Sequence, residues 1–290
     1  MVRKLEATDF RAQRMVLEPD DFALTDGKPD PAPTDLVSSE VWHGIMDLAD
    51  DVAIRTTSHQ GSRIKLLYEL WGAWIETTPS DCIVGYAMMD CSDDFAASII
   101  SMLHGFYRQA IGTLRSALET MMFACFCELT PDRKTWKAWE SGKEEISFGQ
   151  IRHRLGQVST VKALEDRAKT AISRTMFADK NRHDSGGWAT SLHSHLSNFI
   201  HARGNSSNAR IWESNGPIYS AQGMKISYHS YLETYAILLL LAKIAHPSLA
   251  MPHEAEVLFP YDSRRRYLRP RDRKLCGFIK REVFPASVTH

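Results

Sequence analysis

Three histidines, His193, His195 and His201, lie within nine residues in the segment HSHLSNFIHARGN, residues 193–205. Imidazole binds metals and exchanges protons near neutral pH, so the cluster could serve metal or acid–base chemistry. On a helix, however, the three rings point in different directions, and His193 and His201 are about 12 Å apart along the axis. HExxH is absent, and we predict no metal site here.

His201 is the strongest acid–base candidate of the three histidines. Apolar residues cover one face of the predicted helix, and Ser194, Ser197, Asn198 and His201 share the opposite face. Gly204 and Asn205 end the helix, and a helix C-terminus favours a protonated imidazole. His201 could therefore act as an acid or base, with Asn198 orienting a substrate, or it could be an ordinary surface residue.

A second helix, within HGFYRQAIGTLRSALETMMFACF, carries charges on one stripe. His104, Arg108, Arg115 and Glu119 fall within about 60° of one another around the axis. Arg115 and Glu119 are four residues apart, so one interpretation is a buried intrahelical ion pair. In the other, Arg108 and Arg115 face a cleft and bind an anion such as a phosphate.

The elements that position these residues are predicted to be helices. Residues 36–77 follow a helical pattern interrupted near TSHQGS, and residues 82–129 contain no proline and fit two helices that bend near His104–Phe106. Thr130 and Pro131 are typical of a helix start, and Ser147 of a further N-cap. Helices are also expected over residues 160–178 and 226–246.

Asn215-Gly216 is a type I′ turn signal inside an alternating segment, and it predicts a β-hairpin at about 210–221. The expected fold is therefore all-α: a single helical bundle domain with one inserted β-hairpin. We place an extended N-terminal arm or linker at 1–35, the bundle at 36–250 and a basic C-terminal tail at 251–290.

Composition narrows the class of protein. Lys plus Arg equals Asp plus Glu at 35 each, so only local charge clusters bear on nucleic acid. The five cysteines are scattered without a CxxC pair, which favours buried thiols. No signal peptide, membrane-spanning run or cofactor motif is visible, so we expect a cytoplasmic protein without membrane contact or cofactor. A tryptophan stripe at Trp71 and Trp74 is more typical of core than of a small-molecule pocket.

The pair of motifs YRQAIGTLRSALE and LHSHLSNFIHARGN resembles a group of bacterial all-α proteins that carry an R-x-x-x-E helix and a later L-S-x-x-x-H helix. That group is similar to the HEPN-like helical bundles of toxin and phage-defence systems. The resemblance covers roughly residues 60–245 and implies metal-independent RNA cleavage at a homodimer interface.

In HEPN ribonucleases an Arg and a His with four to six residues between them act together. Counting back from His201, the Arg positions hold Ser194, His195 and Leu196, so this chain departs from the pattern. Arg108 or Arg115 could substitute if the two helices face each other. The resemblance then implies a site of His201, Arg115, Arg108, Asn198 and Glu119. The base would act on the 2′-hydroxyl and the cation on the phosphate.

The C-terminal segment is strongly basic. Its predicted phosphate contacts are Arg264, Arg265, Arg266, Arg269, Arg271, Arg273 and Lys274. Tyr267 and Phe278 are interleaved, which suits stacking on nucleic-acid bases. The alternative is a solvated tail that packs on an acidic surface of its own domain.

Two functions remain open at this point. The first is a HEPN-like, metal-independent endoribonuclease of a defence or toxin system, with RNA as substrate. The alternative is a non-catalytic helical module that binds a protein partner or nucleic acid in a defence or regulatory complex. Both predict a homo-oligomer.

Overall fold

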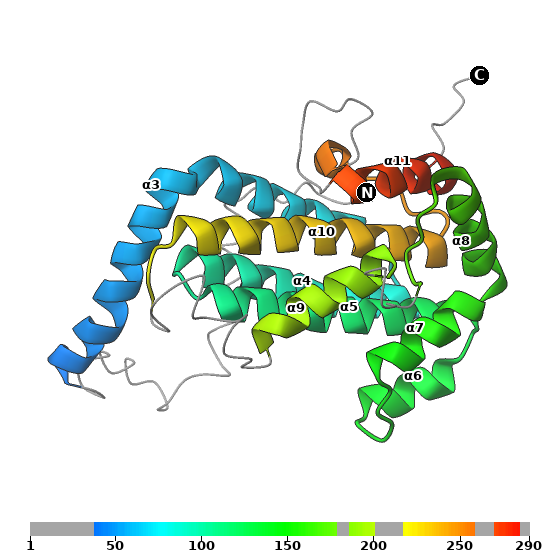
Figure 1. Cartoon of the computed structure of the whole chain (residues 1–290). Coiled ribbons are helices and arrows are strands. Elements are labelled where there is room, and N and C mark those ends of the chain that lie inside the picture. Colours follow the sequence, from blue (N-terminus) through cyan, green and yellow to red (C-terminus); the bar gives the residue numbers. More distant parts are fainter. Residues whose placement is uncertain (1–37, 179–185, 201–216, 259–269, 285–290) are drawn as a thin grey trace. The chain divides into compact units, whose positions relative to one another are not determined.

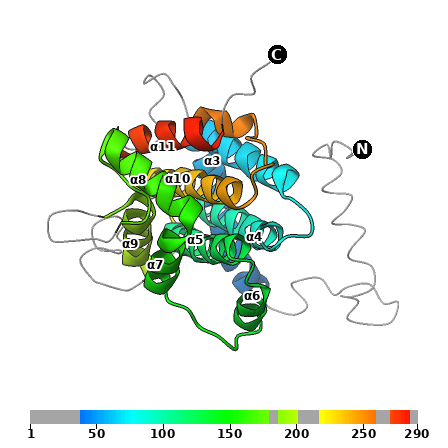
Figure 2. The same cartoon turned by 90° about the vertical axis from the view of Figure 1, so that its right-hand side faces the viewer.

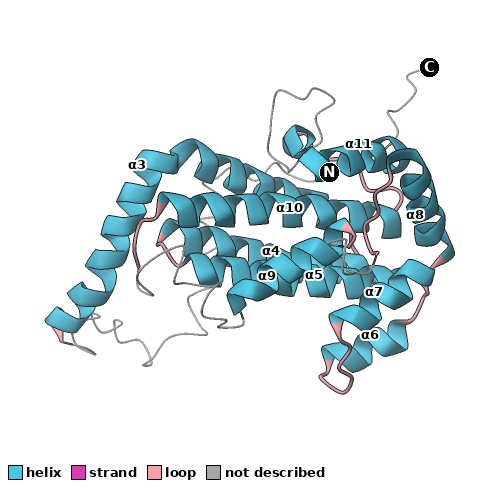
Figure 3. Ribbon diagram, viewed as in Figure 1, coloured by secondary structure: helices cyan, strands magenta, loops and turns pink. Residues whose placement is uncertain are grey.

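The computed structural model describes residues 38–178, 186–200, 217–258 and 270–284. Every regular element in these ranges is a helix, and none is a strand (Figure 3). The all-α prediction is therefore confirmed. None of the helices described is long and apolar enough to cross a membrane.

The chain divides into two compact units, Met1–Leu48 and Ala49–His290. The first contributes the opening turns of helix α3 (Ser39–Thr77), where Val41, Ile45 and Leu48 are exposed. Within α3 the backbone leaves helical geometry at Gln60, with φ −131° and ψ 16°, so the interruption predicted near TSHQGS is confirmed.

Three long helices form the centre of the second unit: α4 (Ile83–Leu103), α5 (Tyr107–Leu129) and α10 (Ala221–Ala245). Helices α4 and α5 pack along each other, and α10 lies against both (Figure 1). From Tyr231 to Ala242 every residue of α10 is buried. This stretch of α10 is thus part of the core, where the helix contacts α4, α5, α9 and α11.

The break between α4 and α5 lies at His104–Phe106, as predicted. Gly105 has φ +80°, a conformation that disfavours L side chains. A Cβ at this position would also lie 2.4 Å from the carbonyl oxygen of Ile218. Glycine is therefore required here for both backbone and space.

Shorter helices surround this centre: α6 (Arg133–Glu140), α7 (Phe148–Gln157), α8 (Ser159–Ile172) and α9 (Trp188–Ile200). Helices α6, α7 and α9 contact α5, and α7 continues into α8 (Figure 2). Ser147 caps α7 in a reciprocal capping box with Gln150, which confirms the predicted cap.

Two local predictions are wrong. Helix α6 starts after Asp132, whose carboxylate accepts from the Thr135 amide, and not at Thr130. Thr130 ends α5 instead, because its hydroxyl donates to the Phe126 carbonyl at 2.7 Å. Helix α8 stops at Ile172, short of the predicted residue 178, since Ser173 turns left-handed with φ 53°.

The predicted β-hairpin is not supported. Residues 210–216 of the segment lie outside the described residues, and residues 217–221 contain no strand. Ser220 is the N-cap of α10, and its hydroxyl accepts from the Gly223 amide at 3.0 Å. The alternation around Ile218 and Tyr219 therefore belongs to an extended approach to a helix.

Part of the basic C-terminal segment belongs to the folded unit. A short 3₁₀ helix, η1 (Glu254–Leu258), is followed by α11 (Pro270–Val283), which packs on α8 and α10. Leu275 and Phe278 are buried there, and Arg167 of α8 pairs with Glu282 at 2.8 Å.

Candidate functional site

Three helices bring polar side chains and one aromatic ring together on one side of α5. Arg115 and Glu119 lie one turn apart on α5, α9 packs on this helix, and α7 contacts it as well. From α9 comes His193 and from α7 comes Phe148. We refer to Arg115, Glu119, His193 and Phe148 as the Glu119 cluster.

One carboxylate oxygen organises the cluster. Glu119 Oε1 lies 2.9 Å from Arg115 Nε and 2.8 Å from His193 Nε2. The predicted ion pair of Arg115 and Glu119 is therefore present, and His193 extends it to a second helix. The three side chains remain 22%, 33% and 16% exposed for Arg115, Glu119 and His193. The cluster is thus reachable from solvent.

The electrostatics keep Glu119 ionised. Burial raises the pKa of its carboxyl, but the hydrogen bond from His193 and the charge and hydrogen bond of Arg115 outweigh burial, so the pKa is lowered overall. An ionised carboxylate only accepts hydrogen bonds. His193 must therefore carry a proton on Nε2, which leaves Nδ1 as the acceptor when the ring is neutral.

The His193 ring is also held from its face. It stacks on Phe148 with centroids 3.6 Å apart and planes 6° apart. Phe148 is the first residue of α7, directly after the Ser147 cap. A hydrogen bond in the ring plane and a stacking contact on its face together fix the orientation of the imidazole.

Arg108, a predicted site residue, has a different role. Its Nε donates to the Phe199 carbonyl at 2.8 Å and its Nη2 to the Ile200 carbonyl at 3.0 Å. A cation that binds the last carbonyls of a helix stabilises that end. Arg108 thus ties the end of α9 to the start of α5, and these two donors are not available to a substrate.

The other predicted residues of α9 do not join the cluster in the described structure. His195 lies within hydrogen-bond distance of Ser230 on α10, at 3.2 Å, and makes an edge contact with Phe199. Asn198 is exposed. His201 lies outside the described residues. The prediction that His193 and His195 point in different directions is confirmed, since they contact different helices.

Of the predicted nucleic-acid contacts, Arg264, Arg265, Arg266 and Arg269 lie outside the described residues. Arg271 is in α11, but its side chain is not described. On the same helix Lys274 is exposed, whereas Arg273 Nε is buried without a hydrogen-bond partner among the described residues.

Three of the cysteines described by the structure are buried in the core and are not suited to nucleophilic or metal chemistry. Cys91, Cys125 and Cys127 are buried, and burial raises their pKa values, that of Cys127 to about 12. Protonated thiols are weak nucleophiles and poor metal ligands. The described residues also contain no group of three or more His, Cys, Asp or Glu side chains arranged for a metal ion.

Sequence reasoning identified Arg115 and Glu119 but missed His193 and Phe148. One property of the sequence could have indicated His193: a partly buried Glu119 requires a second hydrogen-bond donor, and a histidine on a neighbouring helix can provide it.

Comparisons with known protein families, with curated proteins and with solved structures find no match to this chain. The site must therefore be interpreted from its own geometry.

Proposed function

We propose that the protein is a metal-independent endoribonuclease of the HEPN-like kind, with the Glu119 cluster as its active site. The observation that supports this best is the single Glu119 oxygen shared by Arg115 and His193, at 2.9 and 2.8 Å. A carboxylate that fixes the histidine tautomer, together with an adjacent cation, is an arrangement suited to general base catalysis on a phosphodiester.

In the proposed reaction His193 Nδ1 takes the proton of the RNA 2′-hydroxyl. The 2′-oxygen then attacks the phosphorus, a 2′,3′-cyclic phosphate forms, and the bond to the 5′-oxygen breaks. That leaving oxygen takes a proton from an acid, for which His201 stays the candidate. Arg115 is engaged through Nε, and its two terminal nitrogens have no partner among the described residues, so they can stabilise phosphate charge.

The roles differ from those implied by the sequence. His193 replaces His201 as the proposed base, and Arg115 replaces Arg108 as the phosphate ligand. Arg108 becomes a positioning residue, since it holds the carbonyls of Phe199 and Ile200 immediately before His201. Asn198 keeps its proposed part in orienting RNA, because it is exposed on the same helix.

The experiment is RNA cleavage in the presence of EDTA. Wild-type protein should cut single-stranded RNA and leave a 2′,3′-cyclic phosphate, and an otherwise identical substrate with 2′-deoxyribose at the cut should resist. Glu119→Gln and Arg115→Ala should each slow cleavage about a hundredfold. Cleavage that requires added metal, or that proceeds on the 2′-deoxy substrate, would overturn the proposal.

The alternative is a non-catalytic helical module that binds a protein partner or nucleic acid. What favours it is that Arg115, Glu119 and His193 satisfy one another, as a structural tie between α5 and α9 would. Salt-sensitive RNA binding without turnover would support this function over catalysis. Either function predicts a homodimer, and light scattering on the eluting protein that gives the monomer mass would contradict that part.

A further inference from the structure

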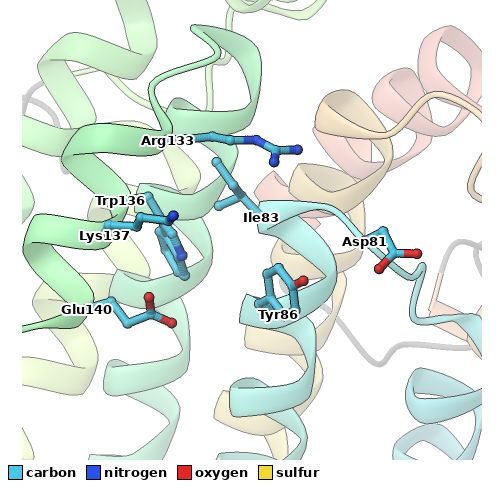
Figure 4. A pocket seen from close by; sticks show the side chains of 7 residues that line it. All are labelled: Asp81, Ile83, Tyr86, Arg133, Trp136, Lys137 and Glu140. Carbon is cyan, nitrogen blue, oxygen red and sulfur yellow. The ribbon is translucent and has the colours of Figure 1, made fainter.

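A separate pocket of about 340 Å³ opens where the start of α4 faces α6 (Figure 4). Its buried lining comes from Ile83 and Trp136, which are 5% and 4% exposed. The ring of Tyr86, which is more than half exposed, forms a further wall. Ligand pockets commonly span about 300 to 1,000 Å³, so this one suits a small molecule.

Helix α6 presents four residues to this α4–α6 pocket at helical spacing. Arg133, Trp136, Lys137 and Glu140 share one face of the helix. Trp136 anchors the helix, because its ring packs against Phe123 with centroids 5.9 Å apart. The side chain of Arg133 extends from α6 across Ile83 (Figure 4). The charged groups are thus carried by a fixed helix.

The charges of the pocket are not used to hold the protein together. Arg133 and Lys137 on α6, and the carboxylates of Asp81 and Glu140, form no ion pair or side-chain hydrogen bond with any other described residue. Arg133 and Lys137 are like charges one turn apart, which repel each other.

We infer that the α4–α6 pocket binds a free α-amino acid with an apolar side chain. Two cations and two carboxylates around an apolar lining match a ligand that carries one charge of each sign. A phosphate dianion would face Asp81 and Glu140 as well as the two cations, so it is disfavoured. Tyr86 and Trp136 offer aromatic surface, which attracts an ammonium group and packs against an apolar side chain.

In this arrangement Arg133 and Lys137 bind the ligand carboxylate, and Glu140, on the same face of α6, binds its ammonium group, while Asp81 lies on the opposite side of the pocket (Figure 4). The ligand side chain lies against Ile83. The pocket shares no residue with the Glu119 cluster, so the inference stands independently of RNA cleavage.

Calorimetric titration of the full-length protein tests the inference. L-Phenylalanine and L-leucine should bind, whereas N-acetyl-L-phenylalanine and L-phenylalaninamide, each lacking one charge, should bind at least about tenfold more weakly. No binding at millimolar concentrations, equal binding of the capped analogues, or tighter binding of inorganic phosphate or adenosine monophosphate would each overturn it.

Matched variants locate the binding. Arg133→Ala and Glu140→Gln should each weaken phenylalanine binding about tenfold. Lys134→Ala is the control, because Lys134 is exposed on α6 and does not line the pocket. A loss of affinity in the control equal to that of Arg133→Ala would place the ligand elsewhere and overturn the assignment.

Discussion

The Glu119 cluster and the α4–α6 pocket both combine cations and carboxylates, but they use them differently. In the cluster one carboxylate accepts from an arginine and a histidine at 2.9 and 2.8 Å. In the pocket Arg133, Lys137, Asp81 and Glu140 form no ion pair with one another. The cluster is carried by α5, α7 and α9, whereas the pocket is lined by residues of α6 and of the start of α4.

The charges of the Glu119 cluster are held in one geometry before any substrate binds, whereas those of the α4–α6 pocket are available to a ligand. A charge that is already paired in the folded protein fixes geometry and tautomer, and it contributes to stability. An exposed charge without an ion-pair partner contributes little to the free energy of unfolding, so its removal changes that free energy only slightly. The same substitution should therefore lower the free energy of unfolding much more in the Glu119 cluster than in the α4–α6 pocket.

The largest contrast is expected between Glu119→Ala and Glu140→Ala. The first leaves Arg115 and His193 partly buried without their shared acceptor and should lower the free energy of unfolding by about 2 kcal/mol. The second should change it by less than about 0.5 kcal/mol. Urea denaturation measures both, and similar losses for the two variants would remove the distinction between the sites.

Asp94 on α4 provides a carboxyl that behaves opposite to Glu119. Burial raises its pKa from 3.8 to about 6, and this outweighs a hydrogen bond with Ser116 that lowers it. The folded protein thus holds this proton more tightly, so Asp94 costs stability as the pH rises from about 4 to 6. Asp94→Asn should raise the free energy of unfolding at pH 7 by about 1.5 kcal/mol.

The sign is reversed for Glu119, whose pKa lies below its ordinary 4.5. Its contribution is present above pH 4.5 and is lost as the pH falls through the lowered pKa. As the pH drops below 4.5, the free energy of unfolding of Glu119→Gln should therefore lose the decrease that Glu119 causes in the wild type. As the pH rises from about 4 to 6, the free energy of unfolding of Asp94→Asn should lose the decrease that Asp94 causes. Identical profiles for the two variants would contradict these assignments.

Removal of the N-cap of α7 should impair the Glu119 cluster, whereas removal of the N-cap of α6 should impair the α4–α6 pocket. Ser147→Ala and Asp132→Ala should each cost about 1 kcal/mol of stability, because each removes a side-chain cap. Ser147→Ala loosens Phe148 against His193, so RNA cleavage should fall while phenylalanine binding stays. Asp132→Ala loosens α6, so phenylalanine binding should weaken while RNA cleavage stays unchanged.

The smallest effect concerns Arg108. Arg108→Ala removes the donors to the Phe199 and Ile200 carbonyls and should cost less than about 1 kcal/mol, confined to the end of α9. Hydrogen exchange should accelerate in the last turn of α9 and stay unchanged in α10. Gln109→Ala, at an exposed neighbouring position, is the control.

Local signals in the sequence predicted the helices well. The absence of proline from residues 82–129 and the HGF break gave α4 and α5, and the serine before Phe148 gave the start of α7. The ion pair of Arg115 and Glu119 was also predictable, because a spacing of four residues places both on one face. The predicted hairpin is not supported by the described residues, because alternation near Ile218 is equally compatible with an extended approach to the Ser220 cap.

What the sequence could not provide is how helices meet. His193 reaches Glu119 only because α9 packs against α5, and no pattern within either helix specifies that contact. The α4–α6 pocket likewise joins Asp81 and Tyr86 to Arg133, which lie far apart in the sequence. Sites built from tertiary contacts require the fold itself.

The central claim is that His193, fixed by Glu119, is the base in RNA cleavage, and one pair of variants tests it most directly. His193 and His195 are both on α9, and each contacts a side chain of a neighbouring helix. In EDTA, His193→Ala should slow RNA cleavage at least about a hundredfold, while His195→Ala should stay close to the wild-type rate. Cleavage by His193→Ala at the wild-type rate, with folding verified by circular dichroism, would contradict the claim.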